Sequence, residues 1–233
     1  MKFVKNNIFD EATWEVSPFG HVIIDNFLNN EYIETMLKEM DMLTTDKSYY
    51  YGNEGIENTK RAFKTNLGSF TDSLFKELCS DEFINQIEKI SGITDIIRNS
   101  INLEGAGIHK VYNNGFLCMH KDFNNTNDLE YGLIDRRINL LLYMNPDWKE
   151  EYGGQLCLYD SNRGKITKKI LPLLNRCVIF NTTDAIHGHP HPMKLPEGIC
   201  RQSLALYYYT KNTTGKAVNG NELLPVQWYH NIK

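Results

Sequence analysis

The sequence predicts an α+β protein in which helices support a mostly antiparallel β-sheet that packs on a second sheet, as in a sandwich or jelly roll. Residues 30–40 and 71–91 carry apolar side chains at helical spacing. After residue 104 the apolar runs become short, rich in β-branched and aromatic residues, and bounded by turn residues. A group of helices followed by a group of strands is typical of this class.

The first hundred residues are expected to contain a strand, two helices and a long loop. Residues 18–28 indicate a strand that runs into a turn, and Gly92 offers a stop for the second helix. Residues 46–68 are polar with no sustained period, so we expect a loop or lid there. The helical stripes consist of Ile33, Met36, Leu37 and Met40 in the first helix, and Phe83, Ile84, Ile87 and Ile90 in the second.

The later part of the chain is expected to be a β core. We find no internal repeat, low-complexity tract or interdomain linker, so residues 1–233 are expected to form one domain, with helical support and a lid in 1–100 and the β core in 101–233. The predicted strands are GIHKVY, GFLCMH, RINLLLYMN, GGQLCLYD, KITKKIL, NRCVIF and RQSLALYYYT.

Composition excludes some classes of function. The chain has 233 residues, a net charge of -4 and a pI near 6.0, which gives no general basic field, so nucleic acid is not an expected partner. No apolar run reaches the roughly 20 residues of a membrane span, and the first residues lack the apolar core of a signal peptide. The expectation is therefore a soluble, cytoplasmic protein. Its five cysteines show no CxxC spacing, so we expect them to be reduced.

The first chemically informative motif is His120-Lys121-Asp122, which ends a predicted strand. In an extended chain, residues i and i+2 face the same side, so an imidazole and a carboxylate can converge on one point. An isolated triplet of this kind is common on protein surfaces. It therefore needs a second element before it indicates a metal site.

That second element is the cluster His187-Gly188-His189-Pro190-His191, which follows another predicted strand. Two histidines and one carboxylate on one face of a metal suit non-haem iron(II) and leave positions open for other ligands. A structural zinc site would need a fourth protein ligand. We favour His187 over His189, because it directly follows the apolar run where the strand is rigid. Solvent-exposed positions in a turn are the alternative for the other two histidines.

Arg201 is a third candidate, because it opens a predicted strand that is otherwise apolar. A buried arginine is costly unless it is paired. A guanidinium can bind a carboxylate with two hydrogen bonds, so it suits the far end of a metal-chelating dicarboxylate. A surface salt bridge is the alternative for this residue.

In these motifs the sequence resembles the prolyl 4-hydroxylase-like branch of the 2-oxoglutarate oxygenases. The resemblance covers about residues 104 to 210. It runs through Gly105-Ala106-Gly107-Ile108-His109, Gly115-Phe116-Leu117, His120-Lys121-Asp122-Phe123-Asn124, the stretch from Arg136 to Asn145 with Trp148, Tyr152-Gly153-Gly154-Gln155-Leu156, Asn175-Arg176 before Phe180, the HGHP cluster, and the stretch from Arg201 to Tyr209.

The resemblance implies a double-stranded β-helix core and a site that uses iron(II), 2-oxoglutarate and dioxygen, with ascorbate as a reductant. It implies iron ligands at His120, Asp122 and His187, and a contact between Arg201 and the distal carboxylate of 2-oxoglutarate. It further suggests that Tyr112 and Tyr143 face the cosubstrate; a place in the core is the alternative for both. Asp122 favours hydroxylation, since the halogenating relatives have a small residue at that position.

The sequence leaves the substrate and the class of function open between alternatives. The resemblance favours a prolyl residue in a peptide or protein, with a free amino acid or another small metabolite as the alternative. A non-catalytic jelly-roll binding module and a cupin-like metalloenzyme without 2-oxoglutarate are the rival classes. Arg201 is the residue that distinguishes the last of these from an oxygenase. The oligomeric state is not predicted.

Overall fold

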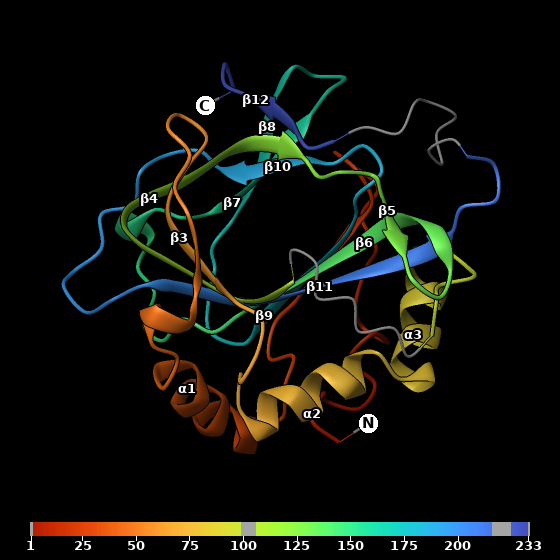
Figure 1. Cartoon of the computed structure of the whole chain (residues 1–233), viewed down its shortest axis with the longest axis horizontal. Helices are drawn as coiled ribbons and strands as arrows, with labels where there is room; N and C mark the ends of the chain where they lie inside the picture. The colour runs from red at the N-terminus through yellow and green to blue at the C-terminus, as the bar shows by residue number, and fades with distance from the viewer. Residues whose placement is uncertain (1, 99–105, 216–224, 233) are drawn as a thin grey trace.

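The computed structural model describes residues 2–98, 106–215 and 225–232, and most of its strands belong to one strongly curled antiparallel sheet (Figure 1). None of the helices in these ranges is long and apolar enough to cross a membrane. The elements in chain order are β1 (His21–Ile24), η1 (Asn30–Tyr32), α1 (Ile33–Asp41), η2 (Thr45–Lys47), β2 (Tyr49–Tyr51), β3 (Glu57–Phe63), α2 (Ser69–Leu78), α3 (Asp81–Ser91), β4 (Gly107–Lys121), β5 (Asn125–Asp128), β6 (Gly132–Tyr143), η3 (Glu150–Tyr152), β7 (Leu156–Asp160), β8 (Lys165–Ile170), β9 (Arg176–Asn181), β10 (Ile186–His189), β11 (Arg201–Lys211) and β12 (Gln227–Tyr229).

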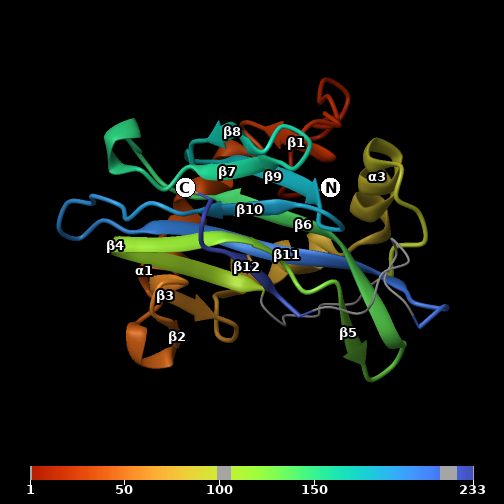
Figure 2. The same ribbon diagram turned by 90° about the horizontal axis from the view of Figure 1, so that it is seen from above.

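The strand order explains how one sheet makes two layers. Hydrogen bonds connect the strands in the order β1-β9-β6-β11-β4-β10-β7-β8. The long strand β4 pairs with β11 through its first half and with β10 near its end, so the sheet turns back over itself at β4 (Figure 2). The result is the jelly roll that the sequence predicts, with β1, β9, β6 and β11 in the larger layer and β10, β7 and β8 in the smaller one.

Alternating side chains along the larger layer divide its residues between two environments. Leu140 and Leu142 of β6 and Leu204 of β11 belong to the main hydrophobic core, together with apolar residues from all three α-helices. Tyr143 lies in a second cluster with residues of β7 and β9, on the other face of the layer. The helices therefore cover the outside of the larger layer, and the inside faces the smaller layer (Figure 1).

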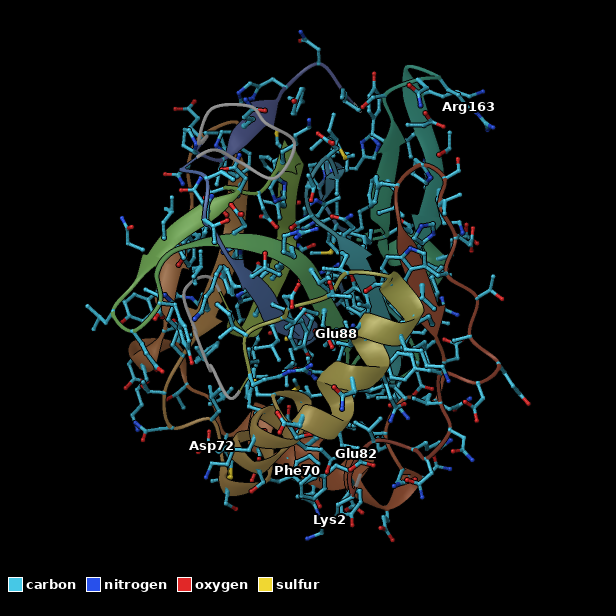
Figure 3. The ribbon with its side chains drawn as sticks, turned by 90° about the vertical axis from the view of Figure 1, so that its right-hand side faces the viewer. Lys2, Phe70, Asp72, Glu82, Glu88 and Arg163 are labelled. Carbon is cyan, nitrogen blue, oxygen red and sulfur yellow. The ribbon has the colours of Figure 1, made fainter. Side chains whose placement is uncertain are left out.

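The predicted helix at 71–91 is two helices in the structure. Ser80 separates α2 from α3, because its hydroxyl accepts a hydrogen bond from the backbone N–H of Phe83 and so caps the start of α3. Gly92 ends α3 with a φ of 70°, as expected for a glycine stop. Figure 3 shows Glu82 and Glu88 along α3, on the outer side of the molecule.

The expectation of an irregular loop over 46–68 is wrong for much of that segment. It contains the antiparallel hairpin of β2 and β3, and β3 pairs with β4. The hairpin lacks an apolar period because cations stack on aromatic rings there: Lys60 lies over Tyr51 and Arg61 lies over Tyr50. Such pairs cover hydrophobic surface without an apolar repeat in the sequence.

Neighbouring tyrosines of β11 face opposite sides of the sheet. Tyr207 lines the central cavity, whereas the Tyr208 hydroxyl donates to the carbonyl of Leu78 in α2. Of the motif that begins at Gly105, the structure describes residues from Ala106 onward, and Gly105 lies outside the described residues.

Candidate active site

A cavity of about 210 Å³ lies between the two layers of the sheet. Its wall includes side chains from both layers, from the β2–β3 hairpin and from the C-terminal strand β12. His120, Asp122, His187 and Arg201 all line this one cavity. The structure thus brings together the four residues that the sequence analysis considered most informative.

His120, Asp122 and His187 form a compact group of metal-ligand type. One ligand atom from each lies within 4.8 Å of the others. The Nε2 atoms of His120 and His187 lie 3.5 and 3.9 Å from the two Asp122 oxygens. This proximity follows from strand pairing, because His187 of β10 stands directly opposite His120 of β4 in the antiparallel register.

Both imidazoles are oriented by their own backbone. Nδ1 of His120 lies 2.9 Å from the carbonyl oxygen of Cys118, and Nδ1 of His187 lies 3.2 Å from that of Ala185. A proton on each Nδ1 satisfies these carbonyls and leaves Nε2 with a lone pair toward the common centre. Hydrogen bonds of this kind fix the ring orientation and tautomer of metal-binding histidines.

The charge states of the group suit a divalent cation. Burial opposes ionisation of Asp122, but Arg136 and the two histidines outweigh it and hold the pKa of this carboxyl below its usual range. Burial, together with the nearby His120, lowers the pKa of His187 to about 4. Asp122 is therefore a carboxylate and His187 a neutral imidazole at neutral pH, which are the forms that bind metals.

Arg136 is a site residue that the sequence analysis missed. Its guanidinium lies 3.5 Å from the ring centroid of Phe123 and 3.7 Å from that of Tyr207, and Nη1 is 3.5 Å from Asp122 Oδ2. Stacking between two aromatic rings lets a cation remain buried. The available signal was a pair of arginines at the start of a strand that is otherwise apolar.

Arg201 reaches into the same cavity and is held by neutral acceptors. Its Nε donates to the carbonyl of Gly154 at 2.8 Å and its Nη2 donates to the Tyr143 hydroxyl at 3.2 Å. Within the described ranges, no carboxylate lies close enough to form an ion pair with it. The buried guanidinium therefore retains the capacity to bind an anionic group.

Gly154 makes the contact with Arg201 sterically feasible. Its φ is +70°, and a Cβ at this position would lie 2.5 Å from Sδ of Met193 and 3.0 Å from Cδ of Arg201. Gly153 and Gly154 both have positive φ values, which allow the backbone to turn tightly here. The turn places a backbone carbonyl where the guanidinium needs an acceptor.

Tyr112, which was expected to face the cosubstrate, is not among the residues that line the cavity in the described part of the chain. Tyr112 is half-buried and lies near Cys200 and Arg61. The cause is a four-residue bulge: Val111 pairs with Lys60, but the next paired residue of β4 is Phe116. The bulge interrupts the regular alternation of side chains along β4 at this point.

Buried polar atoms without a hydrogen-bond partner occur in the described cavity wall, and they include Oδ2 of Asp122, Oδ1 of Asn139 and Nδ1 of His189. Buried polar groups without partners are rare and indicate a missing ligand, ion or water. His189 was expected to lie in an exposed turn, but it is part of β10 and 5% exposed, whereas His191 is exposed. The donor set and the orphaned atoms fit a metal with a polar ligand.

The C-terminal strand closes one side of the site, which the sequence analysis did not foresee. Trp228 of β12 stands opposite His120 of β4 in the strand register, and their ring centroids are 5.0 Å apart. Val226 also lines the cavity. A hydrophobic wall beside the imidazole keeps water away from that side of the group.

Residues 106–209 match the model of the 2OG-Fe(II) oxygenase superfamily. The match spans the strands that carry His120, Asp122, His187 and Arg201. The fold and the His-Asp-His donor set agree with this match, because they resemble those of iron(II) and 2-oxoglutarate dependent oxygenases.

The individual relatives include prolyl hydroxylases. Prolyl 3-hydroxylase OGFOD1 of Mus musculus is 26% identical over 207 residues, which cover 86% of this chain and 34% of that protein. The chain thus spans about a third of the length of this relative. A Pseudomonas putida prolyl-4-hydroxylase superposes with a TM-score of 0.59 at 15% identity, covering 88% of this chain and 95% of that one.

A second solved structure is a Trichoplax adhaerens prolyl hydroxylase in complex with a hypoxia inducible factor peptide fragment. It superposes with a TM-score of 0.54 at 18% identity, covering 81% of this chain and 83% of that one. At these identities, the two structures show that the jelly-roll fold is shared.

Proposed function

We propose that this chain is an iron(II) and 2-oxoglutarate dependent dioxygenase that hydroxylates a prolyl residue of a peptide or protein. The observation that carries the proposal is the joint placement, in one cavity, of a His-Asp-His group and a buried arginine that has no carboxylate partner among the described residues. A cupin-like metalloenzyme that works without 2-oxoglutarate would not need an arginine to bind the distal carboxylate of this cosubstrate.

Each residue has a defined task in this proposal. His120, Asp122 and His187 would hold iron, which with bound 2-oxoglutarate and dioxygen supplies the oxidising power to convert a C–H bond into a C–OH bond. Arg201 would bind the distal carboxylate of 2-oxoglutarate, and the Tyr143 hydroxyl beside it would donate a second hydrogen bond. Ascorbate would serve as the reductant that keeps the iron in its iron(II) state.

The surrounding residues support the same chemistry by position. The Nδ1 contacts with backbone carbonyls aim both imidazoles, and Arg136 holds Asp122 as a carboxylate. Trp228 shields the His120 side from water. The assignment of a prolyl substrate is supported by the OGFOD1 relative and by the hydroxylase fold shared with the peptide complex.

The test is anaerobic titration of the iron(II)-loaded protein with 2-oxoglutarate, followed by turnover. The wild-type protein should give a weak visible charge-transfer band. With oxygen and ascorbate it should form succinate and add 16 daltons to proline-containing peptides. Asp122→Ala should lose the band and the succinate, whereas Asp72→Ala, an exposed control on α2, should retain both. A wild-type protein without the band would refute the proposal.

A further inference from the structure

The hairpin of β2 and β3 places a cation at the rim of the cavity. Lys60 of β3 pairs with Val111 of β4, and both line the cavity. The Lys60 side chain is 19% exposed, whereas Arg201 is only 6% exposed. Lys60 therefore lies nearer to the entrance, where an incoming substrate passes, and Arg201 lies deeper.

The ammonium group of Lys60 is positioned but only loosely paired. Its Nζ lies 5.0 Å from the ring centroid of Tyr51 and 3.9 Å from Oε2 of Glu57, a distance at the limit of an ion pair. The other carboxylate oxygen of Glu57 accepts a hydrogen bond from Asn53 at 2.9 Å. The Tyr51 ring orients the lysine, and the weak contact with Glu57 leaves its N–H donors available.

The charges that line the cavity do not balance. In the described wall there are three cations, Lys60, Arg136 and Arg201, and two carboxylates, Glu57 and Asp122. Iron(II) and 2-oxoglutarate carry opposite charges of equal size, so their binding leaves this surplus of one positive charge unchanged. An uncompensated charge in a largely buried cavity is costly. A substrate with one negative charge would neutralise it.

We propose that Lys60 is a specificity-determining residue that binds a carboxylate of the substrate, so that the enzyme selects substrates with an acidic group close to the oxidised carbon. This inference rests on the proposed function. The carboxylate can belong to an aspartate or glutamate beside the target residue, or to the free C-terminus of a short substrate. The acidic side chain and the free C-terminus present the same carboxylate to the ammonium group, and the experiment below distinguishes between these two sources.

The experiment measures equilibrium binding, with no turnover, to protein loaded with nickel(II) and 2-oxoglutarate. The probes are short synthetic peptides with one proline, in two matched sets: flanking Glu against Gln, and a free C-terminal carboxylate against its amide. Calorimetry on the wild-type protein should show at least one acid binding about tenfold more tightly than its amide. The set that shows the preference identifies the source of the carboxylate.

Variants assign the preference to Lys60. Lys60→Met retains the aliphatic stem over Tyr51 and should abolish the preference, whereas Lys60→Arg should keep most of it. Glu57→Gln should increase it, because it removes the competing carboxylate. Lys64→Met is the matched control on the same hairpin, since Lys64 lies over Tyr49 and does not line the cavity; it should leave the preference unchanged.

Three results would overturn the assignment of Lys60. The first is the absence of any preference for acid over amide in the wild-type protein, and the second is persistence of the preference in Lys60→Met. The third is a loss of 2-oxoglutarate affinity in Lys60→Met as large as the loss for the peptide, which would make Lys60 a cosubstrate residue. Failure of the proposed function would look different, because the nickel-loaded wild-type protein would then not bind 2-oxoglutarate at all.

Discussion

The Arg201 guanidinium donates hydrogen bonds to the Gly154 carbonyl and to the Tyr143 hydroxyl. Among the described residues it has no anionic partner. A guanidinium held by neutral acceptors is prearranged for a carboxylate, because it need not first break an ion pair. Arg201 could be identified from the sequence, because burying an unpaired arginine in an otherwise apolar strand is energetically unfavourable. Its contact with the Gly154 carbonyl could not, since that contact depends on a turn distant in the chain.

Arg201→Met should weaken 2-oxoglutarate binding to the metal-loaded protein by at least about 30-fold, since truncating one partner of a buried charged pair costs about 2 kcal/mol or more. Tyr143→Phe removes one neutral donor and should cost roughly 3- to 10-fold. Calorimetry with nickel(II)-loaded protein measures both. Arg176→Met, which breaks a contact with Asp25 instead, is the control. Equal affinities for wild type and Arg201→Met would contradict the role.

His21 gives the protein a pH-dependent stability. Burial lowers its pKa; the Phe19 carbonyl lies 2.9 Å from Nδ1, and the Lys168 ammonium lies 3.1 Å from Nε2. The folded state therefore favours the neutral ring, whereas the unfolded chain takes up a proton near pH 6.5. Because the unfolded state then binds more protons, the free energy of unfolding should fall as pH decreases below about 6.5.

Urea denaturation at pH 7.5 and 5.5 tests this role. His21→Gln should make the difference between the two unfolding free energies smaller than in the wild-type protein. The exposed His191→Gln should not change it. A pH dependence equal to that of the wild type in His21→Gln would rule out this explanation.

At the scale of elements, the strand register determines the site. Pairing of His187 with His120 brings two distant segments to one point, and the HxD spacing then adds Asp122. The sequence predicted these residues because spacing within a strand and a facial ligand set are local chemical signals. The hairpin of β2 and β3, the bulge after Val111 and the return of β12 depend on tertiary pairing, which leaves no periodic trace in the sequence.

Strand β12 supplies a spectroscopic reporter of metal binding. Trp228 lies 5.0 Å from the His120 ring, so cobalt(II) or nickel(II) at the site should quench its fluorescence. Trp228→Phe should remove most of the metal-dependent quenching, while Trp14→Phe should retain it, because Trp14 packs against the helical core and does not line the cavity. Undiminished quenching in Trp228→Phe would show that β12 does not cover the metal ligands.

At the scale of the whole molecule, the helices stabilise the curled sheet. The main hydrophobic core combines residues of α1, α2 and α3 with the outer face of β6, β9 and β11. The order of helices and strands in the sequence predicted this arrangement. The break between α2 and α3 at Ser80 was not predicted, because apolar side chains at helical spacing continue on both sides of this residue.

Leu140→Ala should lower the free energy of unfolding by about 2 to 5 kcal/mol, because the residue is fully buried between β6 and the helices. Leu129→Ala, at an exposed position, should change it by less than about 0.5 kcal/mol. Urea denaturation of both variants measures the difference. A loss of stability for Leu140→Ala as small as that for Leu129→Ala would argue against the helix–sheet core.

The backbone contacts of the two imidazoles have a consequence for metal selectivity. The carbonyls of Cys118 and Ala185 fix the orientation of both rings before a metal ion binds. A preorganised set of two nitrogen ligands and one oxygen ligand discriminates weakly between divalent ions. Cobalt, nickel and copper follow iron in the usual order of increasing affinity for such a site. Occupancy by iron then depends on which ions the surroundings supply, and chelation followed by reconstitution decides how active a preparation is.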